Sequence, residues 1–169
     1  MNVHGSVPSR ETESGDRRLA MRTQSLPRIN VWNLQRKIPV NVGGLENFAA
    51  GIVKACLQLR KGKQTDLRNV REVFIWLISD RRMALLHRKF LEKKGPTDVL
   101  TFQHGEIFIS VETARRNARA FANFLMRELK LYIVHGLLHL HGFDDQTPSE
   151  ARRMKAAQER ILRACSPHR

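Results

Sequence analysis

The chain has 169 residues, with 30 Lys and Arg against 16 Asp and Glu, so its formal net charge is +14 with neutral histidines. That length suits one domain with a single core. The excess of basic residues favours a polyanionic partner such as nucleic acid. The alternative is a basic surface that only contacts solvent. Two distant cysteines, Cys56 and Cys165, exclude a disulfide framework and favour a reducing cytoplasm. No apolar run is long enough to cross a membrane, and no signal peptide is expected.

The N-terminal half is predicted to open with a disordered extension over residues 1–27, which is polar and contains Met21 as an alternative start. The folded domain is expected over residues 28–165, followed by a flexible end at 166–169. Its first elements, in chain order, are an alternating edge strand at 29–33, a helix at 45–59, a polar loop at 60–69, a bulky central strand at 73–78, and a helix that starts at Ser79-Asp80 and runs to Phe90.

The C-terminal half continues after Gly95-Pro96 with two strands at 97–102 and 106–110, joined by a tight connection. Two helices follow, at about 112–124 and around 129–140, and a last helix runs to Ala164 after a capping box formed by Thr147, Pro148 and Glu150. The sum predicts an α+β fold: a single domain with an about four-stranded mixed sheet, helices mainly on one face, and a metal-binding helix near the C-terminal third.

The metal prediction rests on His135 and His139, which lie four residues apart in a segment that is apolar nearly all round. That spacing places both imidazoles on one side of an α-helix, and an apolar helix should be buried. Buried imidazoles need partners, and a transition metal satisfies two at once. Histidines hydrogen-bonded to backbone are the plain alternative.

A third donor is expected just beyond the helix. Gly142 can end the helix with a chain reversal, and Asp144 and Asp145 follow at once, so a carboxylate can return toward the imidazoles. His141 is a poorer candidate, because two residues from His139 it points to another side of the helix.

The chemistry differs from that of zinc proteases with the H-E-x-x-H motif, in which the glutamate is the general base. Here that position is Gly136, which leaves the space beside the first ligand empty. Two histidines and one aspartate around an open coordination position still fit hydrolysis, and the basic charge favours a phosphodiester. Four basic residues before the Pro-Thr-Asp strand are candidates for holding phosphate or RNA, although each alone fits a solvated surface: Arg88, Lys89, Lys93 and Lys94.

Two separated motifs resemble one family. His135-Gly-Leu-Leu-His139-Leu-His-Gly142-Phe-Asp resembles the H-G-x-L-H-L-x-G-[YF]-D-H signature of the YbeY endoribonucleases. Gly95-Pro-Thr-Asp-Val-Leu-Thr-Phe102 is similar to that family's K-P-T-D-V-L-S-F segment, Gly105–Ser110 is similar to its L-G-D-I-x-I-S strand, and Ile29–Gln35 is similar to its opening strand. The resemblance extends from about Arg28 to Ala164.

The resemblance implies one bound Zn²⁺ and a single-strand-specific endoribonuclease acting in small-subunit (16S) rRNA maturation and ribosome quality control. RNA and ribosomal proteins are the implied partners, in the cytoplasm. The family's ligand positions fall on His135 and His139, and the third falls on Asp145 where the family has a histidine. An aspartate lowers the net positive charge of the site, so bound water should be less acidic. Asp144 is the alternative donor, or else a supporting group.

A second departure concerns an arginine that the family carries directly after an aromatic residue. Here Leu91 follows Phe90, and Arg88, one helical turn back, is the candidate to replace the arginine as a catalytic residue. Leu91 and Asp145 keep an alternative open: a catalytically weakened, metal-binding RNA or ribosome assembly factor. A metallohydrolase with a non-nucleic substrate is a third possibility, which the charge disfavours. The sequence does not determine the oligomeric state.

Overall fold

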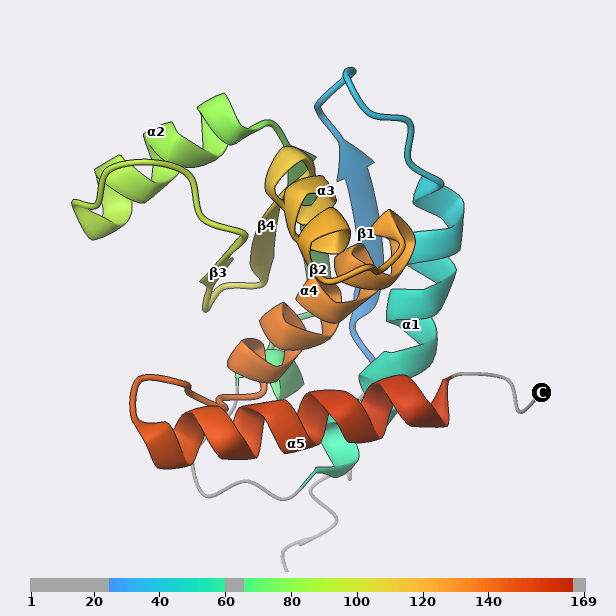
Figure 1. The fold of residues 1–169 in the computed structure, drawn as a ribbon. Helices are drawn as coiled ribbons and strands as arrows, with labels where there is room; N and C mark the ends of the chain where they lie inside the picture. The colour runs from blue at the N-terminus through green and yellow to red at the C-terminus, as the bar shows by residue number, and fades with distance from the viewer. Residues whose placement is uncertain (1–24, 60–65, 166–169) are drawn as a thin grey trace, which may run out of the picture.

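The computed structural model describes residues 25–59 and 66–165. Its elements, in chain order, are β1 (Arg28–Asn33), α1 (Val42–Gln58), the short 3₁₀ helix η1 (Asp66–Arg68), β2 (Glu72–Ile78), α2 (Asp80–Leu91), β3 (Val99–Phe102), β4 (Glu106–Ser110), α3 (Val111–Ala120), α4 (Leu125–Leu140) and α5 (Pro148–Ala164) (Figure 1). Most of the predicted N-terminal extension, the end at 166–169 and much of the loop predicted at 60–69 lie outside the described residues.

The four strands form one mixed sheet in the order β1-β2-β4-β3. Strands β1, β2 and β4 run parallel, whereas β3 pairs antiparallel with β4. The alternating segment at the start of the domain is an edge strand and the bulky segment is an inner strand, because β2 lies between β1 and β4. The predicted α+β class and four-stranded mixed sheet are therefore confirmed.

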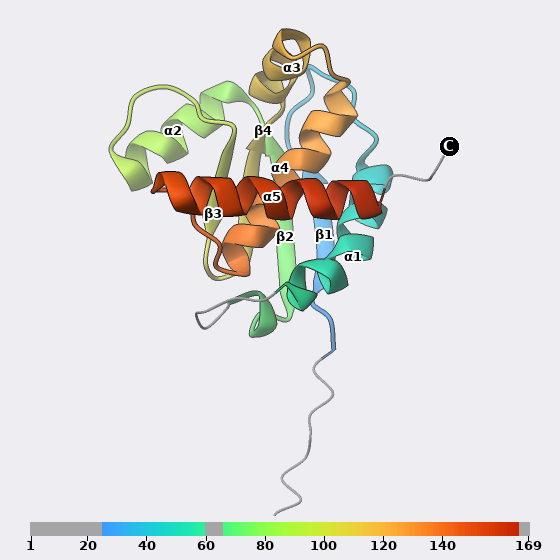
Figure 2. The same cartoon turned by 60° about the horizontal axis from the view of Figure 1, so that its bottom comes forward.

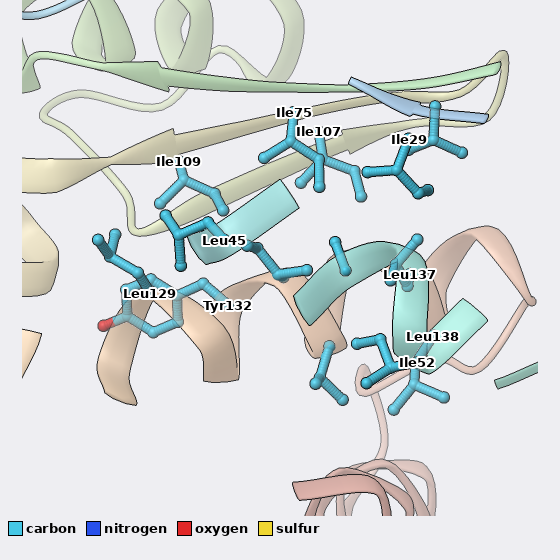
Figure 3. Close-up of a cluster of buried hydrophobic side chains, with 14 of the residues drawn as sticks. Ile29, Leu45, Ile52, Ile75, Ile107, Ile109, Leu129, Tyr132, Leu137 and Leu138 are labelled. Carbon is cyan, nitrogen blue, oxygen red and sulfur yellow. The ribbon is translucent and has the colours of Figure 1, made fainter. Parts of the chain in front are cut away.

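One face of the sheet carries the main core. Its inward side chains are fully or almost fully buried and come from three neighbouring strands: Ile29, Val31, Val73, Ile75, Leu77, Ile107 and Ile109. Figure 3 shows the isoleucines of this set pointing toward α1 and α4. Helix α5 crosses α4 on the side away from the sheet (Figure 2), and α3 packs against α4. Helix α2 packs on the opposite face through Met83, so the helices lie mainly on one face, as predicted.

Helix α4 is buried nearly all round, and Gly136 explains how close it comes to the sheet. A Cβ atom at Gly136 would lie 2.7 Å from Cγ2 of Ile107 in β4. The expectation that the space beside this glycine is empty is therefore wrong, because an isoleucine from the neighbouring layer fills it. The predicted end of the helix is confirmed: Gly142 has a φ of +78° and follows directly on the capping residue His141.

Among the element boundaries that differ from the predictions, those of α1 and α3 have clear local reasons. Helix α1 begins at Val42, three residues earlier, because the side chain of Asn41 accepts a hydrogen bond from the Gly44 N–H and caps it. Helix α3 ends at Ala120 rather than near Phe124. The backbone of Ala122 is left-handed, with φ of 52°, and the Asn123 N–H donates to the Ala118 carbonyl, which closes a turn. The rings of Phe121 and Phe124, which lie in the part predicted as helix beyond Ala120, are both exposed.

Among the residues that the structure describes, none of the helices combines the length and the apolar character that a membrane-spanning segment needs.

Candidate metal centre

The histidines of α4 and an aspartate beyond its end come together. His135 Nε2 and His139 Nε2 lie 2.9 Å apart. Asp145 reaches both rings, with one carboxylate oxygen 3.6 Å from His135 Nε2 and the other 3.9 Å from His139 Nε2. All three donor atoms lie within 4.8 Å of one another. The helical spacing supplies the first two donors, and the reversal at Gly142 supplies the third.

Hydrogen bonds on the far side of each ring determine which nitrogen carries the proton. His139 Nδ1 lies 3.1 Å from the Phe143 carbonyl oxygen, and His135 Nδ1 lies 2.7 Å from Oε1 of Gln158 in α5. Both partners are acceptors, so each Nδ1–H donates and each neutral ring keeps a lone pair on Nε2. Two lone pairs that face each other at 2.9 Å cannot hydrogen-bond, and a cation between them would satisfy both.

The separations fit a metal ion. Donor atoms held about 2.0–2.2 Å from Zn²⁺ in a tetrahedral arrangement lie roughly 3.4 Å apart. The Nε2–Nε2 separation of 2.9 Å lies below that value, and the nitrogen–oxygen separations of 3.6 and 3.9 Å, which go to different oxygens of Asp145, lie above it. Two imidazole nitrogens and one carboxylate oxygen form a donor set that suits Zn²⁺, and a fourth position would remain open for a ligand.

The electrostatics of the site favour the metal-binding form of the rings. Burial lowers the pKa of His139, and the adjacent His135 ring lowers it further, while Asp145 acts in the opposite direction. A neutral imidazole is the form that binds a metal. Asp145 has a side chain 42% exposed and Asp144 is also exposed, so the site opens to solvent on the side of the carboxylates.

The other nearby candidates are placed apart from this group. Asp144 Oδ1 accepts a hydrogen bond from the Asp145 N–H at 2.8 Å, so its carboxylate orients the turn. The His141 ring is buried on another side of the helix, where Nε2 donates to the Leu59 carbonyl oxygen at 3.0 Å. The structure therefore groups Asp145 with the two histidines, as the sequence predicted, and leaves Asp144 and His141 outside.

Gln158 is a component of the site that sequence reasoning missed. It lies in α5, twenty-three positions after His135, where a glutamine among charged residues resembles a surface residue. No local signal could have identified it, because its role depends on how α5 crosses α4. The predicted capping box does position the start of that helix: Thr147 accepts from the Glu150 N–H, and the Glu150 side chain accepts from the Thr147 N–H.

The four basic candidates lie at the end of α2 and in the segment after it, and all are exposed: Arg88, Lys89, Lys93 and Lys94. Within the described part of the chain, none makes a hydrogen bond or ion pair with the histidine–aspartate group. Lys89 lies over the Phe90 ring, with Nζ 5.4 Å from its centroid. Leu91, at the position of the family arginine, is 49% exposed. The structure therefore does not bring these side chains to the donors, and their roles stay predictions.

Fold and site together define a class: an α+β domain with a two-histidine, one-aspartate group that could hold a metal ion. A family model described as "Endoribonuclease YbeY" matches residues 30–166. The chain therefore belongs to the YbeY family, and the resemblance seen in its motifs is confirmed.

Individual relatives agree with this assignment. A protein from Chlamydia felis named "Endoribonuclease YbeY" is 31% identical over 150 residues, which are 80% of this chain and 89% of that protein. A protein of the same name from Anaeromyxobacter is 39% identical over 103 residues, 55% of this chain and 54% of the relative. The chain spans about half the length of the first curated relatives that it matches.

The fold also has a solved counterpart. The solution structure of TM1509 from Thermotoga maritima superposes with a TM-score of 0.52 at 24% identity, covering 80% of this chain and 90% of that one. At that identity the match concerns the fold alone.

Proposed function

We propose that this protein is a metal-dependent endoribonuclease that holds one Zn²⁺ between His135, His139 and Asp145 and cleaves single-stranded RNA. One observation carries the proposal: two Nε2 lone pairs and a carboxylate converge in a member of the YbeY family. The implied substrate is small-subunit ribosomal RNA during maturation or quality control of the ribosome, in the cytoplasm.

A Zn²⁺ ion at this site would supply Lewis-acid chemistry, by polarising a phosphoryl oxygen and making water more acidic. The protein's own residues prepare the site for it. Gln158 and the Phe143 carbonyl hold the two rings in the tautomer that presents Nε2. Asp145 contributes a negative charge, which offsets part of the charge of the metal.

The charge of the chain supports a polyanionic substrate. The net charge is +14, and Arg88, Lys89, Lys93 and Lys94 form an exposed basic cluster at the end of α2. We propose that this cluster contacts RNA phosphates and that Arg88 is the residue of the group that assists cleavage. Arg88→Ala should then lower cleavage without changing the zinc content, whereas Arg163→Ala, at an exposed position of α5, should change neither.

The decisive experiment combines metal content with cleavage. Purified protein should contain close to one zinc per chain, and cleavage of a single-stranded ribosomal RNA fragment should stop with a chelator and return with Zn²⁺. Gln158→Ala removes the acceptor for His135 and should weaken zinc binding about 10–100-fold, as loss of such supporting residues does. His139→Ala removes one of the proposed metal ligands and should weaken zinc binding further.

The matched control is Glu159→Ala, which lies beside Gln158 on the exposed side of α5. It should leave zinc affinity and cleavage unchanged. Zinc affinity that is equal in wild type and His139→Ala would refute the proposed metal site. Cleavage that persists in His139→Ala would indicate a contaminating nuclease and would refute the proposed activity.

A second candidate function is an RNA or ribosome assembly factor that binds metal and lacks catalysis. Leu91 favours it, since an exposed leucine stands where the family has an arginine. RNA binding without chelator-sensitive cleavage would support this alternative.

A further inference from the structure

The face of the sheet opposite the main core carries a row of aromatic side chains, here called the aromatic face and defined by Trp32, Phe74, Trp76, Phe102 and Phe108. The strand register places them together: Trp32 pairs with Trp76, and Trp76 pairs with Phe108. Ring centroids are 6.4 Å apart in the first pair and 6.3 Å apart in the second, with interplanar angles of 24° and 21°. These three rings thus form a nearly aligned row across β1, β2 and β4, and Phe102 of β3 meets Phe108 edge-on.

This surface is accessible. Trp32 at the edge strand is 53% exposed, and Phe90 of α2, which stacks edge-on against Phe102 at 4.9 Å, is 51% exposed. The inner rings are partly buried rather than enclosed. Helix α2 covers one end of the face, where Met83 packs near Ile78 and Leu100. Trp32 is not isolated, because its ring stacks on Trp76, and contiguous exposed apolar surface is typical of a binding site.

The acidic side chains on this face have partners among the described residues, and exposed basic side chains lie on the neighbouring helix α2 and in the segment after it. Glu106 accepts from Trp76 Nε1 at 3.2 Å and pairs with His104, and Glu72 pairs with Arg28. Helix α2, which packs on this face, and the segment after it carry six exposed cations: Arg81, Arg82, Arg88, Lys89, Lys93 and Lys94. The acidic Asp80 at the start of α2 accepts from Ser110, Thr113 and Arg116.

We infer that the aromatic face is a binding surface for single-stranded RNA, separate from the histidine–aspartate group, on which unpaired bases stack while the exposed cations of α2 and the segment after it hold phosphates. Flat aromatic rings beside exposed cations form the usual platform for single strands, since every base has a π face. The inference deepens the proposed function and rests on RNA being the ligand, but it does not depend on cleavage.

The chain offers a direct reporter, because both of its tryptophans lie on the aromatic face. Tryptophan fluorescence should be quenched when an unstructured RNA of about 12 nucleotides is added with chelator, which prevents cleavage. A duplex of the same length should quench far less, because its bases are stacked internally. Trp32→Ala should raise the dissociation constant for the single strand about tenfold, and Trp32→Phe should restore most of the affinity.

Phe124→Ala is the control, since Phe124 is an 84% exposed aromatic residue between α3 and α4 and lies outside the sheet. It should leave the dissociation constant unchanged. RNA binding without quenching, or with equal affinity in Trp32→Ala, would overturn the inference. So would light scattering that shows a wild-type dimer and a monomeric Trp32→Ala, because a second copy would then cover the face.

The same titrations separate this inference from the proposed function. Quenching by single-stranded RNA in a protein that shows no chelator-sensitive cleavage would leave the aromatic face supported and the endoribonuclease proposal refuted. Chelator-sensitive cleavage without quenching would support the endoribonuclease proposal and refute the aromatic face as an RNA-binding surface.

Discussion

At the scale of the residue, position 136 shows how one side chain separates this site from that of a zinc protease. The residue after the first histidine does not face the donor group; it faces β4, where Ile107 leaves no room for a Cβ atom. A glutamate here would be forced into the core rather than toward a metal ligand. Glycine is therefore required for the approach of helix to sheet, and the absence of a general base at this position is a consequence of packing.

Gly136→Ala should be destabilising. The new methyl group would meet Ile107 Cγ2 at 2.7 Å, and overpacking of this kind costs about 1–3 kcal/mol. The gain in helix propensity is at most roughly 1 kcal/mol, so a net loss of up to about 2 kcal/mol is expected. Urea unfolding measures the change. The matched control is Gly51→Ala in α1, where a Cβ atom meets nothing within 4 Å, so stability should rise by about 0.5–1 kcal/mol. Equal effects at both glycines would contradict the packing account.

At the scale of the element, α2 and α3 are tied together at their first residues by a polar network. Asp80 accepts hydrogen bonds from Ser110, Thr113 and Arg116, while the Glu112 carboxylate accepts from the Asp80 N–H and from Lys37. Burial opposes ionisation of Asp80, but these hydrogen bonds outweigh it and hold its pKa below the ordinary value. The Asp80 N–H and Lys37 lower the pKa of Glu112 in the same way.

Lowered carboxyl pKa values make this network sensitive to acid. Its contribution to stability is complete above the ordinary carboxyl pKa of about 4 and is lost as pH falls through the lower values of the folded state. Asp80→Asn should therefore flatten the fall in the urea midpoint between about pH 5 and pH 2, measured with chelator present. Glu159→Gln, at an exposed pair with Arg163, should keep the wild-type slope. An unchanged slope in Asp80→Asn would contradict this role of the network.

At the scale of the whole molecule, the two proposed binding surfaces lie on opposite sides of one sheet. The histidine–aspartate group lies on the helical side, at the end of α4 beside α5, while the aromatic face lies on the other side, bordered by α2. A net charge of +14 acts over both. Long-range attraction would therefore bring RNA to the protein, and local chemistry would decide where it is held.

RNA affinity should fall steeply with salt. If about three phosphates are neutralised, affinity for a single strand falls roughly twentyfold between 50 and 200 mM salt. Zinc affinity should change much less, because the proposed donors would contact the ion directly. Fluorescence titrations at several salt concentrations measure the first quantity, and competition with a chromogenic chelator measures the second. RNA affinity that does not change with salt concentration would contradict the proposal that the positive charge of the protein attracts RNA.

The sequence by itself determined the features that depend on local spacing: two histidines on one side of a helix, a glycine that ends it, an aspartate that returns to them, the capping box of α5, and the alternation of the strands. Only the tertiary structure decided what lies opposite each of these residues. It placed Gln158 behind His135, Ile107 against Gly136, and the aromatic residues of four strands on one surface. The physical reason is that periodicity reveals which face of an element is apolar or reactive, whereas the partner of that face comes from a distant part of the chain through packing.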